Sequence, residues 1–272
     1  MMRWRRTIFF AGLISICFGS FASNYHMKTV QRTGKLYQAF HSLGNVIEDA
    51  ILLNVKLFTI DSAKIITGFL PFFLSARMFD ESVQSHFYDR SCHKNIRQMH
   101  NSCHQIAQKG VGVPMVLLSS LALWAPNERL RQTARMFAIG LPFVHWGKNI
   151  IKTLDTNICL RPWNEHFNRR KRSTGGFPSG HMANVTYMTA LFGMRHGWKW
   201  GVPLGLFSSF VFADFLNCNR HYLSQLIAGV GFGLLYAFAA DKVIHWRAAQ
   251  NLKFDLRCEQ DGKLIASMSC RF

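Results

Sequence analysis

The chain has 272 residues, of which 49% are hydrophobic and 14% aromatic, so it can form one large folded domain and global disorder is excluded. Its 32 lysines and arginines against 14 aspartates and glutamates give a formal charge of +18, which favours anionic partners such as phosphorylated molecules or an anionic membrane surface. Nucleic acid is not expected as a partner, because the sequence contains no zinc-finger spacing and no aromatic RNA-binding signature.

The N-terminus has the pattern of an export signal. Three arginines stand within the first six residues, residues 7–19 are apolar, and Ser20 and Ala22 are small residues where a signal peptidase could cut. The apolar stretch is short for a membrane span, and an uncleaved anchor is the alternative. We therefore predict a signal peptide at residues 1–22 and a protein exported to the periplasm or an equivalent space.

Cysteine usage agrees with export. Seven cysteines are present, and cleavage after Ala22 would remove Cys17 and leave six. An even number in an exported chain predicts disulfide bonds, with 15 possible pairings. Cys92 and Cys103 are the simplest local pair. The histidines beside them could make a metal site instead, but the disulfide is our prediction, and we expect no metal and no cofactor.

Apolar segments with helical spacing follow one another along most of the chain, and no strand-like alternation dominates before residue 250. Residues 43–76 predict two amphipathic helices, whereas residues 77–109 are polar and predict a loop or short helices. Uncharged apolar segments follow at residues 111–126, 136–146, 182–194, 200–213 and 222–240. The predicted fold class is therefore all-α, a helical bundle spanning residues 23–245.

The C-terminal extension, residues 246–272, has a different pattern. Two alternating segments flank a turn pair at residues 261–262, which predicts a β-hairpin. With a two-residue turn, Cys258 would face Ile265, so a bond between Cys258 and Cys270 does not fit easily.

Membrane topology is less clearly indicated. Mean hydropathy is only +0.05, and most apolar segments are shorter than the roughly 20 residues of a membrane span. Residues 222–240 are the exception. We therefore favour a soluble or membrane-associated domain over a polytopic membrane protein.

Three clusters carry residues suited to binding and transferring a phosphoryl group. They are Lys148, Lys152 and Arg161-Pro162; Pro178-Ser179-Gly180-His181; and Asn219-Arg220-His221 to Gln225, leading into Ile227-Ala228-Gly229. A guanidinium binds two phosphate oxygens at once, and the free N–H groups of a helix beginning after Ser179 form an anion site. Two imidazoles can then divide the chemistry, one attacking phosphorus and the other protonating the leaving oxygen.

His221 has local support for the role of nucleophile. Asn219 is a good helix N-cap, and Gln225 follows His221 by four positions, so the two side chains share one helix face. The Gln225 amide oxygen could accept the Nδ1–H of His221 and leave Nε2 unprotonated.

The order of these clusters resembles the type-2 phosphatidic acid phosphatase superfamily, which includes bacterial acid phosphatases, lipid phosphatases and vanadium haloperoxidases on an all-α core. The resemblance covers residues 148–240, about a third of the chain. It implies that His181 is the general acid and His221 the nucleophile. The phosphate ligands that it implies are Lys152, Arg161, Ser179 and Gly180.

Two of the three motifs depart from the family pattern in their cations. Leu154 stands where the first motif has its lysine, so Lys152 lies two residues early, and Lys148 is an alternative. Phe215 stands where the third motif has an arginine. Arg220, beside the nucleophile, could bind phosphate in its place.

The third motif also departs in its carboxylate. Gln225 replaces the family's aspartate, and Asp214 could supply the missing charge from the preceding helix. The implied function is a metal-independent phosphatase that hydrolyses phosphate monoesters, either of a small molecule or of a phospholipid, through a phospho-histidine. The alternatives are a vanadate-dependent peroxidase on the same pocket and a catalytically impaired phosphate- or lipid-binding protein.

Overall fold

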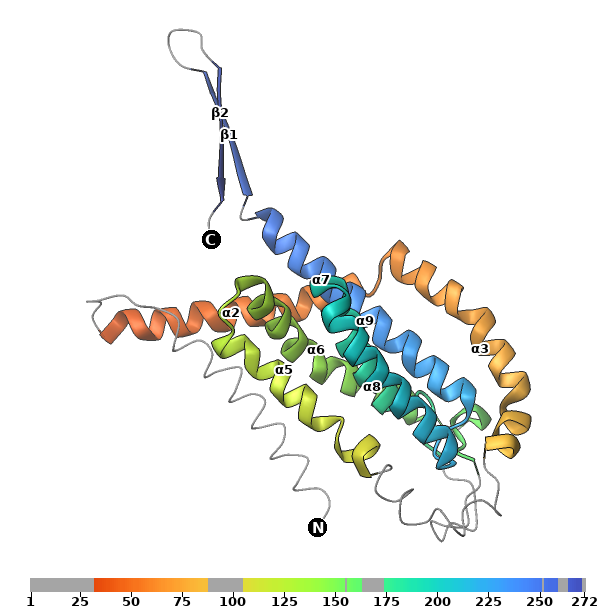
Figure 1. The fold of residues 1–272 in the computed structure, drawn as a ribbon. Coiled ribbons are helices and arrows are strands. Elements are labelled where there is room, and N and C mark those ends of the chain that lie inside the picture. Colours follow the sequence, from red (N-terminus) through yellow and green to blue (C-terminus); the bar gives the residue numbers. More distant parts are fainter. Residues whose placement is uncertain are drawn as a thin grey trace.

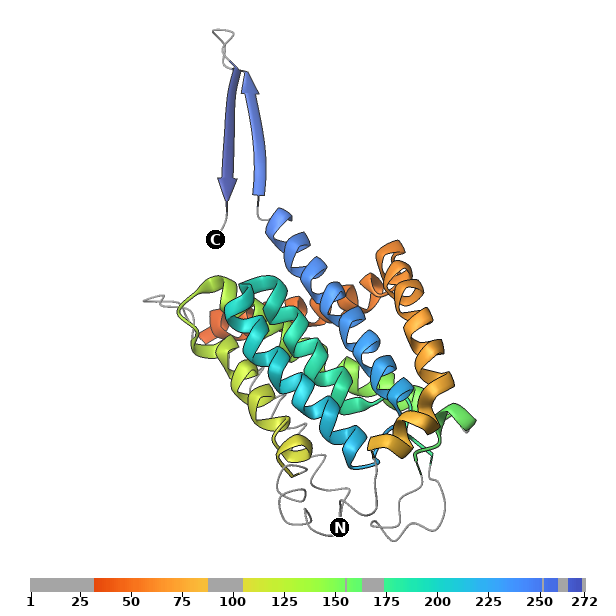
Figure 2. The same ribbon diagram turned by 45° about the vertical axis from the view of Figure 1, so that its right-hand side comes forward.

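The computed structural model describes residues 32–87, 105–154, 156–162, 174–250, 252–258 and 264–270, and these form a bundle of helices with a hairpin at its C-terminal end (Figures 1 and 2). The predicted all-α bundle is confirmed. The helices are α2 (Arg32–Lys56), α3 (Ile60–Phe87), α5 (Gly112–Trp124), α6 (Glu128–Lys152), α7 (Gly180–His196), α8 (Trp198–Asn217) and α9 (Leu223–Gln250), with a 3-10 turn η1 (Asn157–Cys159).

Helix α9 lies at the centre of the bundle and packs against α7, α3, α2 and α6. The core between α6 and α7 is aromatic, with Phe137 stacked on Tyr187 at a ring distance of 5.2 Å. The buried Tyr187 hydroxyl donates a hydrogen bond to the Met136 carbonyl at 2.8 Å, so this polar group is satisfied inside the core.

Two glycines allow α9 to approach α7 at backbone distance. A Cβ atom on Gly229 would lie 2.6 Å from the carbonyl oxygen of Ser179, and one on Gly233 would overlap the carbonyl oxygen of Ala183. Small residues at this spacing are typical of closely packed helix pairs. The close approach places the start of α7 directly beside the start of α9.

We expect Gly233→Ala to lower the free energy of unfolding by about 2 kcal/mol, because overpacking against a backbone outweighs the roughly 1 kcal/mol by which alanine favours a helix. Thermal unfolding of the purified chain in detergent measures the effect. The control is Gly205→Ala on α8, whose Cβ would meet only Thr189 at 4.0 Å. Equal stability of the two variants would contradict the packing argument.

Helix α3 is longer than the sequence indicates. It runs to Phe87, so the predicted loop or short helices at residues 77–109 are wrong for residues 77–87. This part of α3 buries polar side chains, Asp80 and Gln84, against polar groups of residues 216–224. A helix with a polar buried face lacks the apolar stripe on which the prediction depended.

The predicted C-terminal hairpin is present, formed by β1 (Leu252–Cys258) and β2 (Leu264–Cys270) after α9, which itself continues past the predicted boundary at residue 245. Cys258 pairs with Leu264 rather than with the predicted Ile265, because five residues instead of two separate the strands. Cys258 and Cys270 therefore stand at opposite ends of the hairpin, which projects away from the helices (Figure 1).

Two described helical stretches are long and apolar enough to cross a membrane. One is Gln105–Trp124, which joins a helical segment at residues 105–109 to α5, and the other is Leu223–Ala249 in α9. Residues 44–56 and α3 together pass the same test as one broken span with a bend of 52°. Large apolar side chains are exposed on the outer faces of α3, α5 and α8, among them Phe72, Leu117 and Leu206. The structure thus adds further spanning candidates to residues 222–240.

Cys159 and Cys218 are buried free thiols. The prediction that six cysteines form disulfides is therefore wrong for these two, which pack as small buried side chains near the Thr156 hydroxyl and the Asp214 carboxylate, each at 3.4 Å. The predicted signal peptide and the pair Cys92 and Cys103 lie outside the described residues and stay predictions.

Candidate active site

The three clusters meet at one end of the bundle, where α6 ends and α7 and α9 begin. The Gly176 N–H donates to the Cys159 carbonyl at 2.8 Å, and the Ser179 N–H donates to the Gln225 carbonyl at 3.0 Å. These main-chain bonds join the second cluster to both of the others. Residues about 70 positions apart in sequence are thereby held in one site.

His221 lies in the short link between α8 and α9. Asn219 adopts a left-handed φ of 54°, and the Arg220 N–H bonds back to the Phe215 carbonyl at 3.1 Å, as in a Schellman C-cap. The prediction of Asn219 as the N-cap of the next helix is therefore wrong, because this residue ends α8 and α9 begins only at Leu223. Because the chain reverses sharply here, His221 lies inside the site, where it is 3% exposed.

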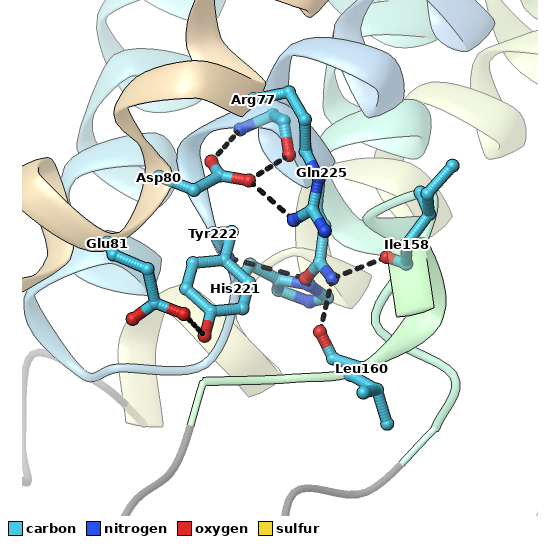
Figure 3. Close-up of polar contacts among 9 residues, drawn as sticks. Arg77, Asp80, Glu81, Ile158, Leu160, His221, Tyr222 and Gln225 are labelled. Carbon is cyan, nitrogen blue, oxygen red and sulfur yellow. Dashed lines mark hydrogen bonds and ion pairs between the residues drawn. The ribbon is translucent and has the colours of Figure 1, made fainter. Parts of the chain in front are cut away.

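Gln225 fixes the orientation of the His221 ring (Figure 3). Its Nε2 amide group donates to the carbonyls of Ile158 at 3.0 Å and Leu160 at 2.7 Å. Both amide hydrogens are therefore used, and Oε1 must face the Nδ1 atom of His221, which lies 3.2 Å away. The predicted contact between these two side chains is present, and it places the proton of His221 on Nδ1.

Arg161 lies on the other side of the same imidazole. Its NH1 atom is 3.4 Å from Nε2 of His221 and 2.9 Å from the Arg220 carbonyl, and its NH2 atom donates to the Gly175 carbonyl at 3.1 Å. A guanidinium can only donate, so Nε2 carries the lone pair. His221 is thus held as a single tautomer, with its lone pair beside a fixed cation.

His181 occupies the first turn of α7 and contacts a segment that the sequence did not indicate. Its Nε2 atom lies 3.2 Å from the Gln108 carbonyl oxygen, an acceptor, so the His181 proton is on Nε2. The Phe215 ring lies 5.0 Å from the His181 ring and 5.7 Å from the His221 ring. This phenylalanine, which stands where the resemblance implied an arginine, is buried and packs near both imidazoles.

Burial and cations keep both histidines neutral. The pKa of His181 is lowered to about 4, first by burial and then by the charges of Lys148, Lys152 and Arg220, while the contact with the Gln108 carbonyl acts in the opposite direction. The pKa of His221 falls well below its usual value, through burial first and then through the charges of Arg161 and Lys152. At neutral pH both imidazoles are therefore neutral before an anion binds.

We expect the protein to lose stability as the pH falls from about 6.5 toward 4. An unfolded histidine takes up its proton near pH 6.5, whereas folded His181 does so only near pH 4, so the unfolded state binds more protons in this interval. The loss from His181 reaches at most about 3 kcal/mol. Denaturant unfolding across this pH range should give a shallower slope for His181→Asn than for wild type, and an unchanged slope would contradict the expectation. The exposed His245→Asn is the control.

Both candidate lysines of the first cluster lie near the site. Lys148 is buried, and its Nζ atom lies 2.5 Å from where a Cβ atom on Gly180 would be, so the missing side chain of Gly180 makes room for the ammonium. Lys152 is half-buried, and its charge acts on both histidines. Lys148, which the sequence left as the alternative, is therefore the lysine packed against the start of α7.

Ser179 stands at the predicted N-cap position of α7, but its hydroxyl does not cap the helix. Within the described part of the chain, the buried Oγ has no hydrogen-bond partner. Together with the uncapped first N–H groups of α7, this hydroxyl is a donor available to an anion.

Asp214 is buried at the end of α8, and its supply of a charge to His221 stays a prediction. The Asp214 carboxylate is near the Cys218 thiol one turn later, at 3.4 Å, and the charged and polar groups that act on His221 are Arg161, Lys152, Gln225 and His181. The charge of Arg220 acts on His181, and its carbonyl accepts a hydrogen bond from Arg161, so Arg220 lies at the site. Its role as a phosphate ligand stays a prediction.

The sequence did not indicate that α3 takes part in the site. Asp80 binds Ser224, and Glu81 accepts a hydrogen bond from the Tyr222 hydroxyl at 2.8 Å (Figure 3). Polar residues recurring at helical spacing from residue 77 to residue 84 were the only signal available, and they lie about 140 residues before their partners.

No family model and no curated protein matches this sequence. A search of solved structures finds a likeness to the crystal structure of a transmembrane PAP2 type phosphatidylglycerolphosphate phosphatase from Bacillus subtilis, with 14% sequence identity and a TM-score of 0.31. The likeness covers 64% of this chain and 96% of that chain. Because it is distant, we base the functional proposal on the contacts within this chain.

Proposed function

We propose that this chain is a membrane-associated phosphatase that hydrolyses phosphate monoesters or lipid phosphates through a phospho-histidine on His221. The observation that carries the proposal is the environment of this imidazole, with Nδ1–H held by Gln225 and the Nε2 lone pair beside Arg161. A nucleophilic histidine needs this tautomer and needs a cation where negative charge develops on the phosphoryl group.

In the first step, Nε2 of His221 bonds to phosphorus while the bond from phosphorus to the leaving oxygen breaks, and His181 protonates that oxygen. In the second step, His181 takes a proton from water, the water oxygen bonds to phosphorus, and the bond to His221 breaks to release phosphate. Arg161 and Lys148 hold the phosphoryl oxygens, with Lys152, Arg220, Ser179 and the main chain at Gly180 around them. The negative charge of a bound phosphate raises the pKa of His181 and so prepares it as the acid.

Lipid phosphates are the substrate class that we favour, because two helices with the length and apolarity of membrane spans contribute to the site, Gln225 from Leu223–Ala249 and the Gln108 carbonyl from Gln105–Trp124. A small soluble phosphate ester fits the same chemistry. Export through residues 1–22 and a periplasmic location are part of this proposal, since they agree with an extracytoplasmic lipid substrate.

The test uses the full-length chain in detergent with EDTA, assayed with p-nitrophenyl phosphate and with a panel of phospholipid phosphates. We expect wild type to turn over, His221→Ala to lose turnover, and His181→Ala to lose most of it on alkyl phosphates. p-Nitrophenolate needs little protonation, so His181→Ala should still form the phospho-enzyme from that substrate and then accumulate it. An alkaline quench and mass spectrometry should locate the phosphate on His221.

Other results would assign another function. Turnover that survives both substitutions would exclude the histidine mechanism. Phosphate binding without turnover on any substrate would indicate the impaired binding protein, and halide oxidation that appears only after vanadate is added would indicate the peroxidase.

A further inference from the structure

The C-terminal part of α3 contains a buried carboxylate that no step of the proposed reaction uses. Asp80 is 2% exposed, and Arg77 pairs with it at 3.0 Å from the preceding turn of the same helix. A buried carboxylate is costly unless it is paired and hydrogen-bonded, so its remaining partners indicate why it is there.

Those partners belong to the start of α9. One oxygen of Asp80 accepts the Ser224 N–H at 2.8 Å, and the other accepts the Ser224 hydroxyl at 2.6 Å. Ser224 is the second residue of α9, and Tyr222, at the N-cap position, has no side-chain oxygen placed to accept that N–H. Asp80 therefore caps α9 from a different helix, and its charge also suits the positive end of the helix dipole.

The same turn of α9 holds the nucleophile. Gln225, the third residue of the helix, accepts the Tyr222 N–H through Oε1 at 3.3 Å, which is the second half of a capping box. This oxygen is also the one that holds Nδ1 of His221. The N-terminal turn of α9 and the orientation of the imidazole thus depend on one amide oxygen (Figure 3).

We propose that Asp80 is a positioning residue for His221: by capping α9 from α3, it keeps the first turn of the helix intact, and with it Gln225 and the imidazole tautomer. The assignment of its catalytic consequence rests on the proposed phosphatase function. Two neighbouring contacts from α3 act in the same direction, Glu81 to the Tyr222 hydroxyl and Gln84 to Asn219.

The test compares Asp80→Ala with Asp80→Asn in the full-length protein. We expect Asp80→Ala to lower kcat about 30-fold with little change in KM, because a displaced nucleophile loses its alignment while the phosphate ligands stay. Asp80→Asn keeps an oxygen that can accept the Ser224 N–H and should recover most of the loss. Rates are expressed per active site, counted from the stoichiometry of inorganic phosphate binding, so that unfolded protein does not contribute.

Asp49→Ala is the matched control. Asp49 is another buried carboxylate, 3% exposed, and it binds Arg135 and Arg247 where α2, α6 and α9 meet. Its loss should lower stability but leave kcat per active site unchanged. If Asp80→Ala is too unstable to purify, Ser224→Ala removes one of the two contacts and should give a smaller fall in kcat, about 5-fold.

A second readout does not need turnover. Histidine labelled with ¹⁵N reports the tautomer directly, and we expect His221 to change from the Nδ1–H form to a mixture in Asp80→Ala but not in Asp49→Ala. Unchanged kcat per site and an unchanged His221 spectrum in Asp80→Ala would overturn the inference while leaving the phosphatase proposal standing. A wild type without turnover would instead overturn the proposed function, and the His221 spectrum would still decide whether Asp80 orients the ring.

Discussion

Gln225→Glu is expected to destabilise the protein by about 3 kcal/mol at pH 8 and to lower turnover about 100-fold, although it would supply a carboxylate beside His221. The Gln225 side chain is fully buried, and its amide group donates to the carbonyls of Ile158 and Leu160 at 3.0 and 2.7 Å. A carboxylate of the same shape would place an oxygen against these two carbonyl oxygens, with no hydrogen to donate.

The pH dependence of the stability of Gln225→Glu distinguishes a buried carboxylate without hydrogen-bond donors from a general loss of packing. Burial and two carbonyl neighbours raise the pKa of the introduced glutamate above its unfolded value, so the variant loses stability as pH rises. The histidines of wild type act in the opposite direction, because their lowered pKa values cost stability as pH falls. Gln225→Met, which lacks both the charge and the hydrogen bonds, is the control and should not lose stability at rising pH. A more active Gln225→Glu would show that the carbonyls can turn away.

Arg161→Lys is expected to lower kcat/KM about 300-fold although it keeps the positive charge. The guanidinium reaches the Arg220 and Gly175 carbonyls and Nε2 of His221 with two nitrogens, a geometry that a single ammonium cannot reproduce. The lysine variant therefore leaves a carbonyl unpaired and loses the fork that would bind two phosphoryl oxygens.

Steady-state kinetics with p-nitrophenyl phosphate, together with the affinity for inorganic phosphate, measures the effect of Arg161→Lys. Arg131→Lys, which alters a surface ion pair with Glu128 at the start of α6, is the control and should change neither quantity. If the two variants behaved alike, Arg161 would act only as a charge.

Local geometry could be predicted from the sequence, and long-range geometry could not. The contact between His221 and Gln225 follows from four-residue spacing, and it is present in the structure. The choice between Lys148 and Lys152 stayed open because it depends on how closely α6 approaches Gly180, a tertiary distance. Asn219 suits both an N-cap and a left-handed C-cap, and only the position of α8 decides between them.

The part of the site contributed by α3 was missed for a different reason. Asp80 and Gln84 make a helix face that is buried yet polar, and residues 77–87 were therefore predicted as part of a loop or short helices. The cost of burying these two side chains is offset by hydrogen bonds to residues about 140 positions later in the chain, and a local sequence pattern contains no information about such partners. The fold class was predictable because five later apolar segments repeat a simple helical signal.

Gln225 links the three segments that meet at the site, around residues 158–160, 179 and 221. Its carbonyl accepts the Ser179 N–H, and its amide group donates to the carbonyls of Ile158 and Leu160. Its Oε1 faces Nδ1 of His221. The segments should therefore open as one cooperative unit rather than one by one. Hydrogen–deuterium exchange would show this directly, with the amides of Ser179 and Ser224 exchanging at one common opening free energy. We therefore expect a substrate to enter while all three of these segments keep their positions, so that the binding site has the same shape before and after the substrate binds.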